Sequence, residues 1–315
     1  MGLTEPSSAR RRIDLRPGYS IARLIHGGWQ LASDHRADPL DRSAAVDALL
    51  RLADDGFTTF DGADIYTGVE RLYGDLVRAW CRRGGDRDGL QIHTKLVPDL
   101  HDLPRLERAD VESIVDRSLR RLGVDILDLV QFHWWDWSVP GWLDAVGWLD
   151  AARQAGKVRH VAVTNFDTPR LRALLDAGFD IVTHQVQHSL LDGRAGRQAA
   201  SFGEGSDVHQ LAYGSLAGGF LTARWLGRAD PGSELANRSL VKYRLIVDEI
   251  GGWTALQELL AVLATIARRH GVSIANVAAR WALDRPGIAA VIVGGRGDQH
   301  RGDNGKIFDL RLDDE

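Results

Sequence analysis

An acid and a phenol stand five residues apart in the stretch 58–74, at a junction between a strand and a loop. Residues 58–60 are β-branched or aromatic, which predicts a short buried strand. Asp61 ends this strand, and Tyr66 follows in the loop before an amphipathic helix that opens at Glu70. In parallel α/β proteins, the loops at the carboxyl ends of the strands carry the chemistry. The stretch therefore predicts a carboxylate and a phenol at the edge of a site.

Two more polar side chains, Lys95 and His133, end the strands predicted at 90–94 and 126–132. A lysine within an apolar barrel needs an anionic or hydrogen-bonding partner, and Asp61 could be that partner. An ammonium beside a phenol favours the phenolate and lowers the phenol pKa from its usual value of about 10. His133 could orient a carbonyl group by a hydrogen bond. Together the four groups predict proton donation to an oxygen while a hydride reaches its carbon.

Each of these residues also has a purely structural interpretation. An aspartate after a strand often caps a turn, a tyrosine in a loop usually packs, and a histidine at a strand end is often a hydrogen-bonded core group. Lys95 is the hardest of the four to explain in this way, because apolar residues flank it.

Strand and helix patterns alternate along the chain. Strands are predicted at 22–26, 58–60, 90–94, 126–132, 158–163, 181–183, 211–213 and 289–293. Helical periodicity separates nearly all of them, which implies parallel strands and right-handed crossovers. Eight such units in 315 residues fit a closed (β/α)8 TIM barrel. The Pro17-Gly18 pair predicts an N-terminal β-hairpin before the barrel.

An open doubly wound sheet is the alternative fold. It requires a G-x-G-x-x-G turn directly after the first strand, and Gly27-Gly28-Trp29 does not match that pattern. Residues 194–207 are rich in Gly, Ala and Ser, which predicts a poor helix or a mobile loop.

Length and composition favour a single domain over residues 1–315, with 1–9 as a disordered tail. The hydrophobic fraction of 44% is sufficient for a large core, and a net charge of −4 with interspersed signs indicates no nucleic-acid partner. No apolar run is long enough for a membrane span. Cys81 is the only cysteine and no leader pattern is present, so a cytoplasmic location is expected.

The sequence resembles the aldo-keto reductase family over nearly its whole length. The resemblance is carried, in chain order, by FDGADIY with Glu70 and Gly74, HTK, LDLVQFHW, VAVTNFD, QVQHSLL, AYGSLAGGFL and IVGGR. It implies a barrel of this kind that binds NADPH without a Rossmann fold. It also implies an Asp-Tyr-Lys-His catalytic tetrad, which falls on Asp61, Tyr66, Lys95 and His133.

The resemblance further implies which residues hold the nicotinamide end of the cofactor. Thr164, Asn165 and Gln185 would bind the carboxamide, and Tyr213 would stack on the ring.

The phosphates and the adenosine fall on the glycine-rich turns and the C-terminal segment. Gly214 and Leu216 would lie along the pyrophosphate, Arg296 would approach the 2′-phosphate, and Asn304 would approach the adenine. Backbone N–H groups in such turns suit phosphate on physical grounds. The remaining expected cofactor-binding residues are Gly28, Gly294, Gly295 and His300. Many family members have a lysine where Gly294 stands, so a preference for NADP(H) over NAD(H) rests on Arg296, supported by His300 or Arg301.

Trp29 and Trp134 adjoin the predicted site residues and are expected to form walls of the substrate pocket. Aromatic walls suit an apolar, aromatic or sugar-ring carbonyl compound. The expected function is NADP(H)-dependent reduction of a small aldehyde or ketone, with Tyr66 as the general acid, by a monomer or small homo-oligomer.

Two other functions are considered. A cofactor-binding regulatory subunit with slow turnover would keep the same residues. A hydrolase would pair Asp61 or Asp64 with Glu70, but it leaves Lys95 and Asn165 without roles. No metal site is expected, since no His-x-His pair follows a strand.

Overall fold

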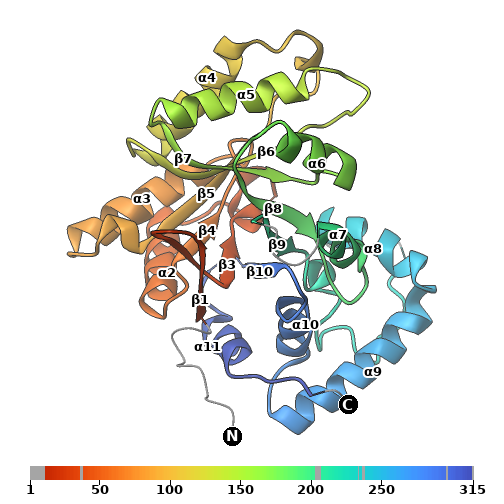
Figure 1. Ribbon diagram of the computed structural model, residues 1–315. Coiled ribbons are helices and arrows are strands. Elements are labelled where there is room, and N and C mark those ends of the chain that lie inside the picture. Colours follow the sequence, from red (N-terminus) through yellow and green to blue (C-terminus); the bar gives the residue numbers. More distant parts are fainter. Residues whose placement is uncertain are drawn as a thin grey trace, which may run out of the picture.

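Eight parallel strands close into a barrel in the order β10-β3-β4-β5-β6-β7-β8-β9 (Figure 1). The computed structural model describes residues 11–35, 38–202, 207–232, 234–235, 238–295 and 297–313. The barrel strands are β3 (Leu24–Gly27), β4 (Thr59–Asp61), β5 (Gln91–Leu96), β6 (Leu127–Phe132), β7 (Val158–Thr164), β8 (Ile181–Gln187), β9 (His209–Tyr213) and β10 (Ile288–Gly294). The predicted (β/α)8 TIM barrel is confirmed, whereas the tail predicted at 1–9 lies outside the described residues.

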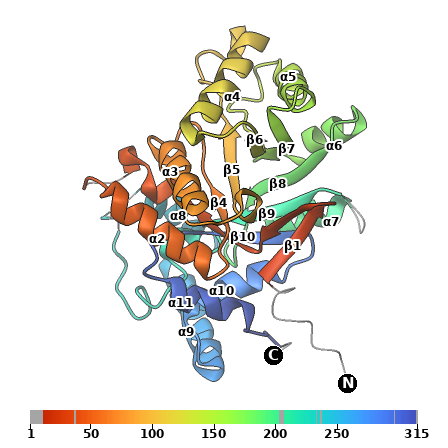
Figure 2. The same cartoon turned by 90° about the vertical axis from the view of Figure 1, so that its left-hand side faces the viewer.

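Helices cover the outside of the barrel (Figure 1; Figure 2). They are α2 (Arg42–Asp54), α3 (Val69–Arg82), α4 (Arg108–Leu122), α5 (Trp142–Gln154), α6 (Thr168–Asp176), α7 (Arg194–Phe202), α8 (Arg238–Glu249), α9 (Gly252–His270), α10 (Ile274–Leu283) and the short α11 (Arg301–Gly305). In α3, Val69, Leu72, Tyr73 and Leu76 recur at helical spacing and are all buried. This apolar stripe fixes which face of α3 meets the barrel.

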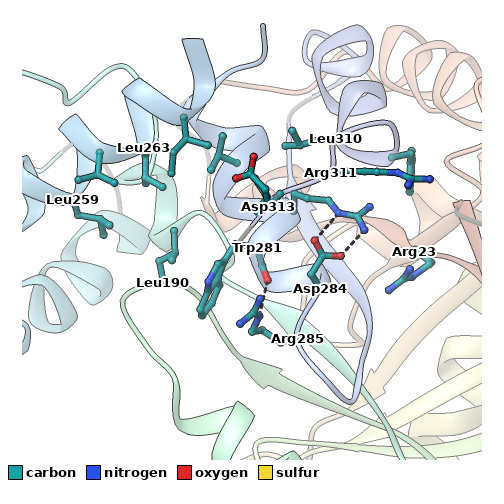
Figure 3. A pocket seen from close by; sticks show the side chains of 16 residues that line it. Arg23, Leu190, Leu259, Leu263, Trp281, Asp284, Arg285, Leu310, Arg311 and Asp313 are labelled. Carbon is teal, nitrogen blue, oxygen red and sulfur yellow. Dashed lines mark hydrogen bonds and ion pairs between the residues drawn. The ribbon is translucent and has the colours of Figure 1, made fainter. Parts of the chain in front are cut away.

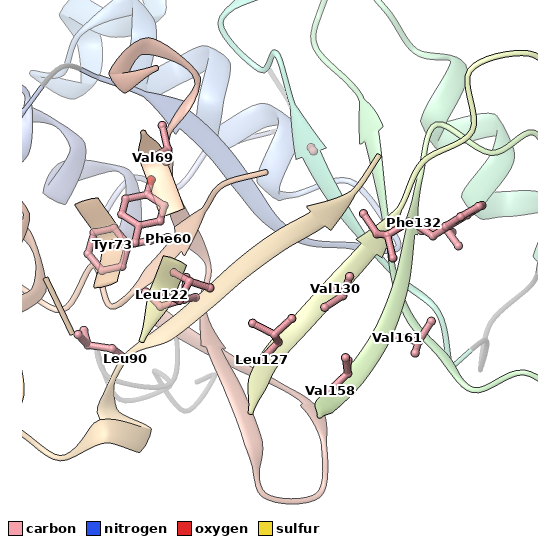
Figure 4. Close-up of a cluster of buried hydrophobic side chains, with 14 of the residues drawn as sticks. Phe60, Val69, Tyr73, Leu90, Leu122, Leu127, Val130, Phe132, Val158 and Val161 are labelled. Atoms are coloured by element: carbon pink, nitrogen blue, oxygen red, sulfur yellow. The ribbon is translucent and has the colours of Figure 1, made fainter. Parts of the chain in front are cut away.

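The strands are apolar on both faces because the barrel has two cores. Val130 and Val161 point outward into the core beneath the helices, where they lie near Leu127, Phe132 and Val158 (Figure 4). Their neighbours Leu129 and Ala162 point into the barrel. Alternation with period two along strands that are buried on both faces explains the continuous apolar runs in the sequence.

The predicted N-terminal hairpin is present as β1 (Arg12–Arg16) and β2 (Tyr19–Ala22), with Gly18 at φ +76° in the turn. Leu15, Tyr19 and Ile21 of the hairpin are buried in the same cluster as the inward-facing strand residues. The hairpin therefore closes one end of the barrel, and the strands' carboxyl ends are left at the other.

One segment matches one of two expected alternatives and another differs from expectation. Residues 194–202 form helix α7, in the stretch where a poor helix or a mobile loop was predicted. The long insertion after β9 contains α8, which was not predicted at all. Leu240, Tyr243 and Val247 of α8 are buried in one cluster with residues of the neighbouring α9 and with Leu191 and Leu310, so α8 gains part of its apolar contacts from distant parts of the chain.

No single helix among the described residues is long and apolar enough to cross a membrane. Only α8 and α9 taken together reach that length and composition, and the chain bends by 94° between them.

Gly74 allows α3 to pack tightly against the end of α4. A Cβ atom at this position would lie 2.5 Å from the Leu122 carbonyl oxygen and 2.9 Å from that of Arg121. Because backbone atoms cannot yield easily, we expect Gly74→Ala to lower the free energy of unfolding by about 1–3 kcal/mol in urea titrations. Gly147→Ala in α5 is the matched control, since its Cβ would meet only the Phe179 ring, at 3.8 Å. Gly147→Ala should raise the free energy of unfolding by about 0.5–1 kcal/mol. The same change in the free energy of unfolding for both variants would contradict the packing argument.

Buried His184 on β8 predicts a loss of stability in acid. Its Nε2 accepts a hydrogen bond from the Phe166 backbone N–H at 3.0 Å, and burial lowers its pKa from 6.5 to about 3. Below pH 6.5 the unfolded chain therefore takes up a proton that the folded protein does not, so stability falls as pH falls. Between about pH 8 and about pH 5, the wild type should lose about 2 kcal/mol more than His184→Gln, whose amide oxygen can still accept the bond. Urea titrations at both pH values test this, and parallel losses would exclude the histidine as the cause.

Candidate active site

A buried ion pair lies at the carboxyl ends of β4 and β5. The Lys95 ammonium donates to Asp61 Oδ2 at 2.7 Å and to the Gly62 carbonyl oxygen at 2.7 Å. Lys95 is 6% exposed and Asp61 4% exposed. Burial alone lowers the pKa of Lys95, but the Asp61 charge and the hydrogen bonds with Asp61 and Tyr66 raise it, so the amine stays protonated.

Two glutamines satisfy the second oxygen of Asp61. Gln131 of β6 donates to Oδ1 at 2.7 Å, and Gln185 of β8 donates to the same atom at 2.8 Å. Gln185 also donates to Gln131 Oε1 at 2.8 Å, so both hydrogens of its amide are engaged. Of the Gln185 side-chain amide, a ligand can therefore use only the oxygen, Oε1. Gln131 was not predicted, although its place two residues before His133 in a strand puts both on one face.

Tyr66 lies in the loop between β4 and α3, with the Lys95 ammonium 4.9 Å from its ring centroid. Burial raises the pKa of the phenol, and the nearby Lys95 charge and hydrogen bond offset only part of that rise. The expected net lowering is therefore wrong, because desolvation of a phenolate outweighs the ammonium. At neutral pH the phenol keeps its proton.

His133 follows β6, and its backbone N–H donates to the Leu96 carbonyl oxygen at 3.0 Å. Burial lowers the pKa of its imidazole, and the Lys95 charge acts in the same direction against a backbone hydrogen bond at Thr164. The ring is therefore neutral at neutral pH and can donate one hydrogen bond. Register places it beside the strand of Lys95, since Lys95 pairs with Gln131.

The aromatic residues at this rim are Trp29 and Trp135. Trp29 contacts Tyr66 edge-on at 5.2 Å between ring centroids and is 36% exposed. Trp135 contacts His133 edge-on at 4.6 Å, is 48% exposed, and donates its indole N–H to the Pro98 carbonyl oxygen.

Trp134, which was predicted to line the pocket, is 1% exposed. It stacks on Phe132 in the outer core and donates to the Val139 carbonyl oxygen at 3.1 Å. The prediction for Trp134 is therefore corrected in favour of its neighbour Trp135, which the sequence analysis did not select as a wall.

The residues predicted to hold a nicotinamide lie side by side at the ends of β7, β8 and β9. Tyr213 donates to Asn165 Oδ1 at 2.9 Å, and the Asn165 backbone N–H donates to the Gln185 carbonyl oxygen at 3.0 Å. Thr164 Oγ1 donates to that same carbonyl at 3.1 Å. Asn165 has a φ of +58°, an uncommon conformation for a residue other than glycine that turns its backbone at the end of β7.

The glycine-rich segment after β9 fits a phosphate. Gly214 has a φ of +71°, and a Cβ there would collide with the Tyr243 side chain of α8, so packing alone already requires a glycine. Ser215 follows it, and its buried Oγ has no hydrogen-bond partner among the described residues. Leu216 completes the turn. A buried hydroxyl without a partner in such a turn can serve a ligand oxygen, and Ser215 was not predicted.

The other predicted cofactor residues are less informative. Gly28 donates its N–H to the Asp61 carbonyl oxygen at 2.7 Å, and a Cβ there would meet Tyr73 and Val69, so packing already requires a glycine. Gly294 is the last residue of β10 and Gly295 follows it, whereas His300 is the N-cap of α11 and Asn304 lies within that helix. Arg296 lies outside the described residues.

A cavity of about 760 Å³ lies elsewhere, between α9, α10 and residues 308–313 (Figure 3). None of the predicted site residues lines it. The converging side chains at the strand ends, and not this cavity, locate the candidate site.

Comparisons with known proteins agree with the fold. Residues 23–315 match the model of the Aldo/keto reductase family. The chain is 26% identical to aldo-keto reductase YhdN of Bacillus subtilis, over 89% of this chain and 82% of that protein. It is 28% identical to 6-dehydroglucose reductase of Agrobacterium fabrum, over 90% of this chain and 88% of that one.

A third relative is longer. The chain is 29% identical over 78% of its length to flagellar radial spoke protein 5 of Chlamydomonas reinhardtii, and the match spans 58% of that protein. Among solved structures, glycerol dehydrogenase from Gluconobacter oxydans has the same fold, with a TM-score of 0.79 at 23% identity over 97% of this chain and 92% of that one. With a family model that matches nearly its whole length and a barrel of the same kind, the chain belongs to the aldo/keto reductase family of oxidoreductases.

Proposed function

We propose that the protein reduces an aldehyde or ketone with NADPH and that Tyr66 donates the proton. The observation that carries this proposal is the Lys95 ammonium, which sits between the Asp61 carboxylate at 2.7 Å and the Tyr66 ring. A bound nicotinamide supplies a hydride to the carbonyl carbon. The protein must then give a proton to the carbonyl oxygen.

Tyr66 is suited to that step because its proton is held until an oxyanion develops. The raised pKa keeps the phenol protonated at neutral pH. Once the proton leaves, the Lys95 ammonium stabilises the phenolate in a poorly solvated site, and Asp61 holds the ammonium in place. Neutral His133 can donate to the same carbonyl oxygen and orient it.

The substrate class follows from the rim and from the relatives. Trp29 and Trp135 present exposed aromatic faces beside Tyr66 and His133. Such faces pack against the C–H face of a ring. Relatives are named for a dehydroglucose and for glycerol, so a small polyhydroxy carbonyl compound, or the corresponding alcohol, is the class to test.

The hydrolase alternative is not favoured. The side chain of Asp64 is fully buried and pairs with Arg117, and that of Glu70 is 2% exposed and pairs with Arg121. Paired glycosidase carboxylates must both face the substrate, and these two do not. A slow regulatory subunit keeps the same residues and is separated from an enzyme by its turnover rate.

Tyr66→Phe removes the proposed acid while keeping the ring. We expect kcat with a generic aldehyde to fall by about 10²–10⁴-fold and the dissociation constant for NADPH, measured by fluorescence, to change little. Tyr19→Phe is the matched control, because it removes another buried phenol, hydrogen-bonded to His93 at 3.0 Å, at the opposite end of the barrel. Turnover of Tyr66→Phe at the wild-type rate would refute the acid role.

Arg296→Ala tests the preference for NADPH. Loss of a charged hydrogen bond to the 2′-phosphate should weaken NADPH by about 1–3 kcal/mol and leave NADH nearly unchanged. Arg301→Ala tests the other candidate arginine. Because Arg301 already pairs with Asp55 at 2.9 Å, its loss should weaken NADPH binding less than Arg296→Ala does. Equal losses for both cofactors in fluorescence titrations of Arg296→Ala would show that this side chain does not read the phosphate.

A further inference from the structure

We propose that Asp64 is a positioning residue for this reaction: its buried carboxylate, held by Arg117, fastens the loop that carries Tyr66 to the strand that carries Lys95. The inference rests on the proposed function, in which Tyr66 is the acid and Lys95 its charged neighbour. Nothing in the sequence motif assigns Asp64 this part, and its side chain does not face a substrate.

The main chain shows how Asp64 extends the pairing of β4 with β5. Beyond the end of β4, the Gly62 N–H donates to the His93 carbonyl at 2.8 Å and the Asp64 N–H donates to the Lys95 carbonyl at 3.3 Å. In a parallel ladder the next bond would join the Val97 N–H to the Asp64 carbonyl. Instead, Val97 N–H donates to Asp64 Oδ1 at 3.3 Å. The carboxylate thus replaces a backbone acceptor, and Asp64 makes one hydrogen bond to the Lys95 carbonyl and one to the Val97 N–H, on either side of Leu96.

The displaced carbonyl of Asp64 is held from the other side by α4. Arg121 donates to it at 2.7 Å and to Glu70 Oε2 at 3.1 Å, while Arg117 donates to Asp64 Oδ2 at 3.0 Å. Thr94 Oγ1 donates to Glu70 Oε1 at 2.7 Å. The loop is therefore clamped between β5 and α4 on both sides of Tyr66.

The charge of Asp64 depends on this clamp. Its pKa is raised to about 7, because burial and the nearby Glu70 charge raise it by more than Arg117 and the Val97 N–H lower it. Removing the Arg117 guanidinium should therefore leave a neutral carboxyl with a weaker acceptor for Val97.

The clamp acts on catalysis through Tyr66, which lies two residues after Asp64. The Tyr66 N–H closes a turn onto the Ala63 carbonyl at 3.1 Å, so the ring's place over Lys95 is set by the backbone around Asp64. A misplacement of about 1 Å in a reacting group can cost roughly 10²-fold in rate. A clamp of this kind should affect proton donation more than cofactor binding, since most of the residues proposed to hold the cofactor lie at or after the ends of β7, β8, β9 and β10.

The barrel supplies its own control in Asp128. This carboxylate is also buried, accepts the Ile92 N–H at 2.8 Å and pairs with Arg87 at 2.9 Å. It makes the same bonds as Asp64 to the same strand, but at the amino end of β5. A role in stability alone would make the two aspartates equivalent.

The experiment compares Asp64→Asn with Asp128→Asn in protein labelled with carbon-13 at the tyrosine ring. The chain has five tyrosines, and Tyr66→Phe identifies the Tyr66 signal. For Asp64→Asn we expect a shifted Tyr66 signal, a kcat lower by about 10–100-fold, and an NADPH dissociation constant within about two-fold of wild type. Asp128→Asn should leave the Tyr66 signal and kcat unchanged even if it lowers stability.

Arg117→Gln changes the partly exposed partner and provides the same readouts if Asp64→Asn does not fold. It should reproduce the shifted Tyr66 signal and the lower kcat of Asp64→Asn. The double variant should lower kcat no further than either single variant, because both substitutions remove the same interaction between Asp64 and Arg117. An unmoved Tyr66 signal with wild-type kcat, equal effects from Asp128→Asn, or additive losses in the double variant would each overturn the proposal. Wild-type turnover by Tyr66→Phe would instead refute the proposed function, and the tyrosine signals would still report on the clamp.

Discussion

The pairing of Lys95 with Asp61 inside the barrel constrains the rest of the site. Two charges removed from water are costly unless every lone pair and proton finds a partner. Here Gly62, Gln131 and Gln185 complete the hydrogen bonds of the pair, so side chains from β4, β5, β6 and β8 must keep fixed positions. The pair contributes little to stability on this argument. Its effect is to hold one ammonium at one point at the carboxyl ends of the strands.

The position of the Lys95 ammonium can serve a reaction only because the two ends of the barrel differ. The hairpin fills the amino end, where Tyr19 bonds His93 within the core. The carboxyl end carries Asn165 and Tyr213, which are hydrogen-bonded to each other, and the glycine-rich turn with the Ser215 hydroxyl, which has no hydrogen-bond partner in the described part of the chain. Strands alone could hold Asp61, Lys95 and the glutamines. Tyr66 lies on a loop, and a loop reaches the same precision only through bonds such as those of Asp64.

Local sequence was sufficient for the barrel and for the residues at strand ends. β-branched runs and helical stripes such as that of α3 have the same periodicity in the sequence and in the structure. Three features could not be inferred locally: α8, the exchange of Trp134 for Trp135, and the direction of the Tyr66 pKa. Each depends on burial or on a partner distant in sequence. The adjacent residues Trp134 and Trp135 are equivalent in the sequence. Only the place where the strand ends determines that Trp134 packs in the core and Trp135 is exposed.

The raised pKa of Tyr66 is compatible with its proposed part and changes how the acid must work. A phenol made acidic in the resting site would already be ionised near its lowered pKa and would have no proton to give. Burial prevents this, and the Lys95 charge lowers the cost of ionisation only partly. Proton transfer from Tyr66 becomes favourable when an alkoxide, a much stronger base than the phenolate, forms beside the ring. The ammonium is then fixed in advance at 4.9 Å from the ring centroid, so little reorganisation is needed as the proton moves.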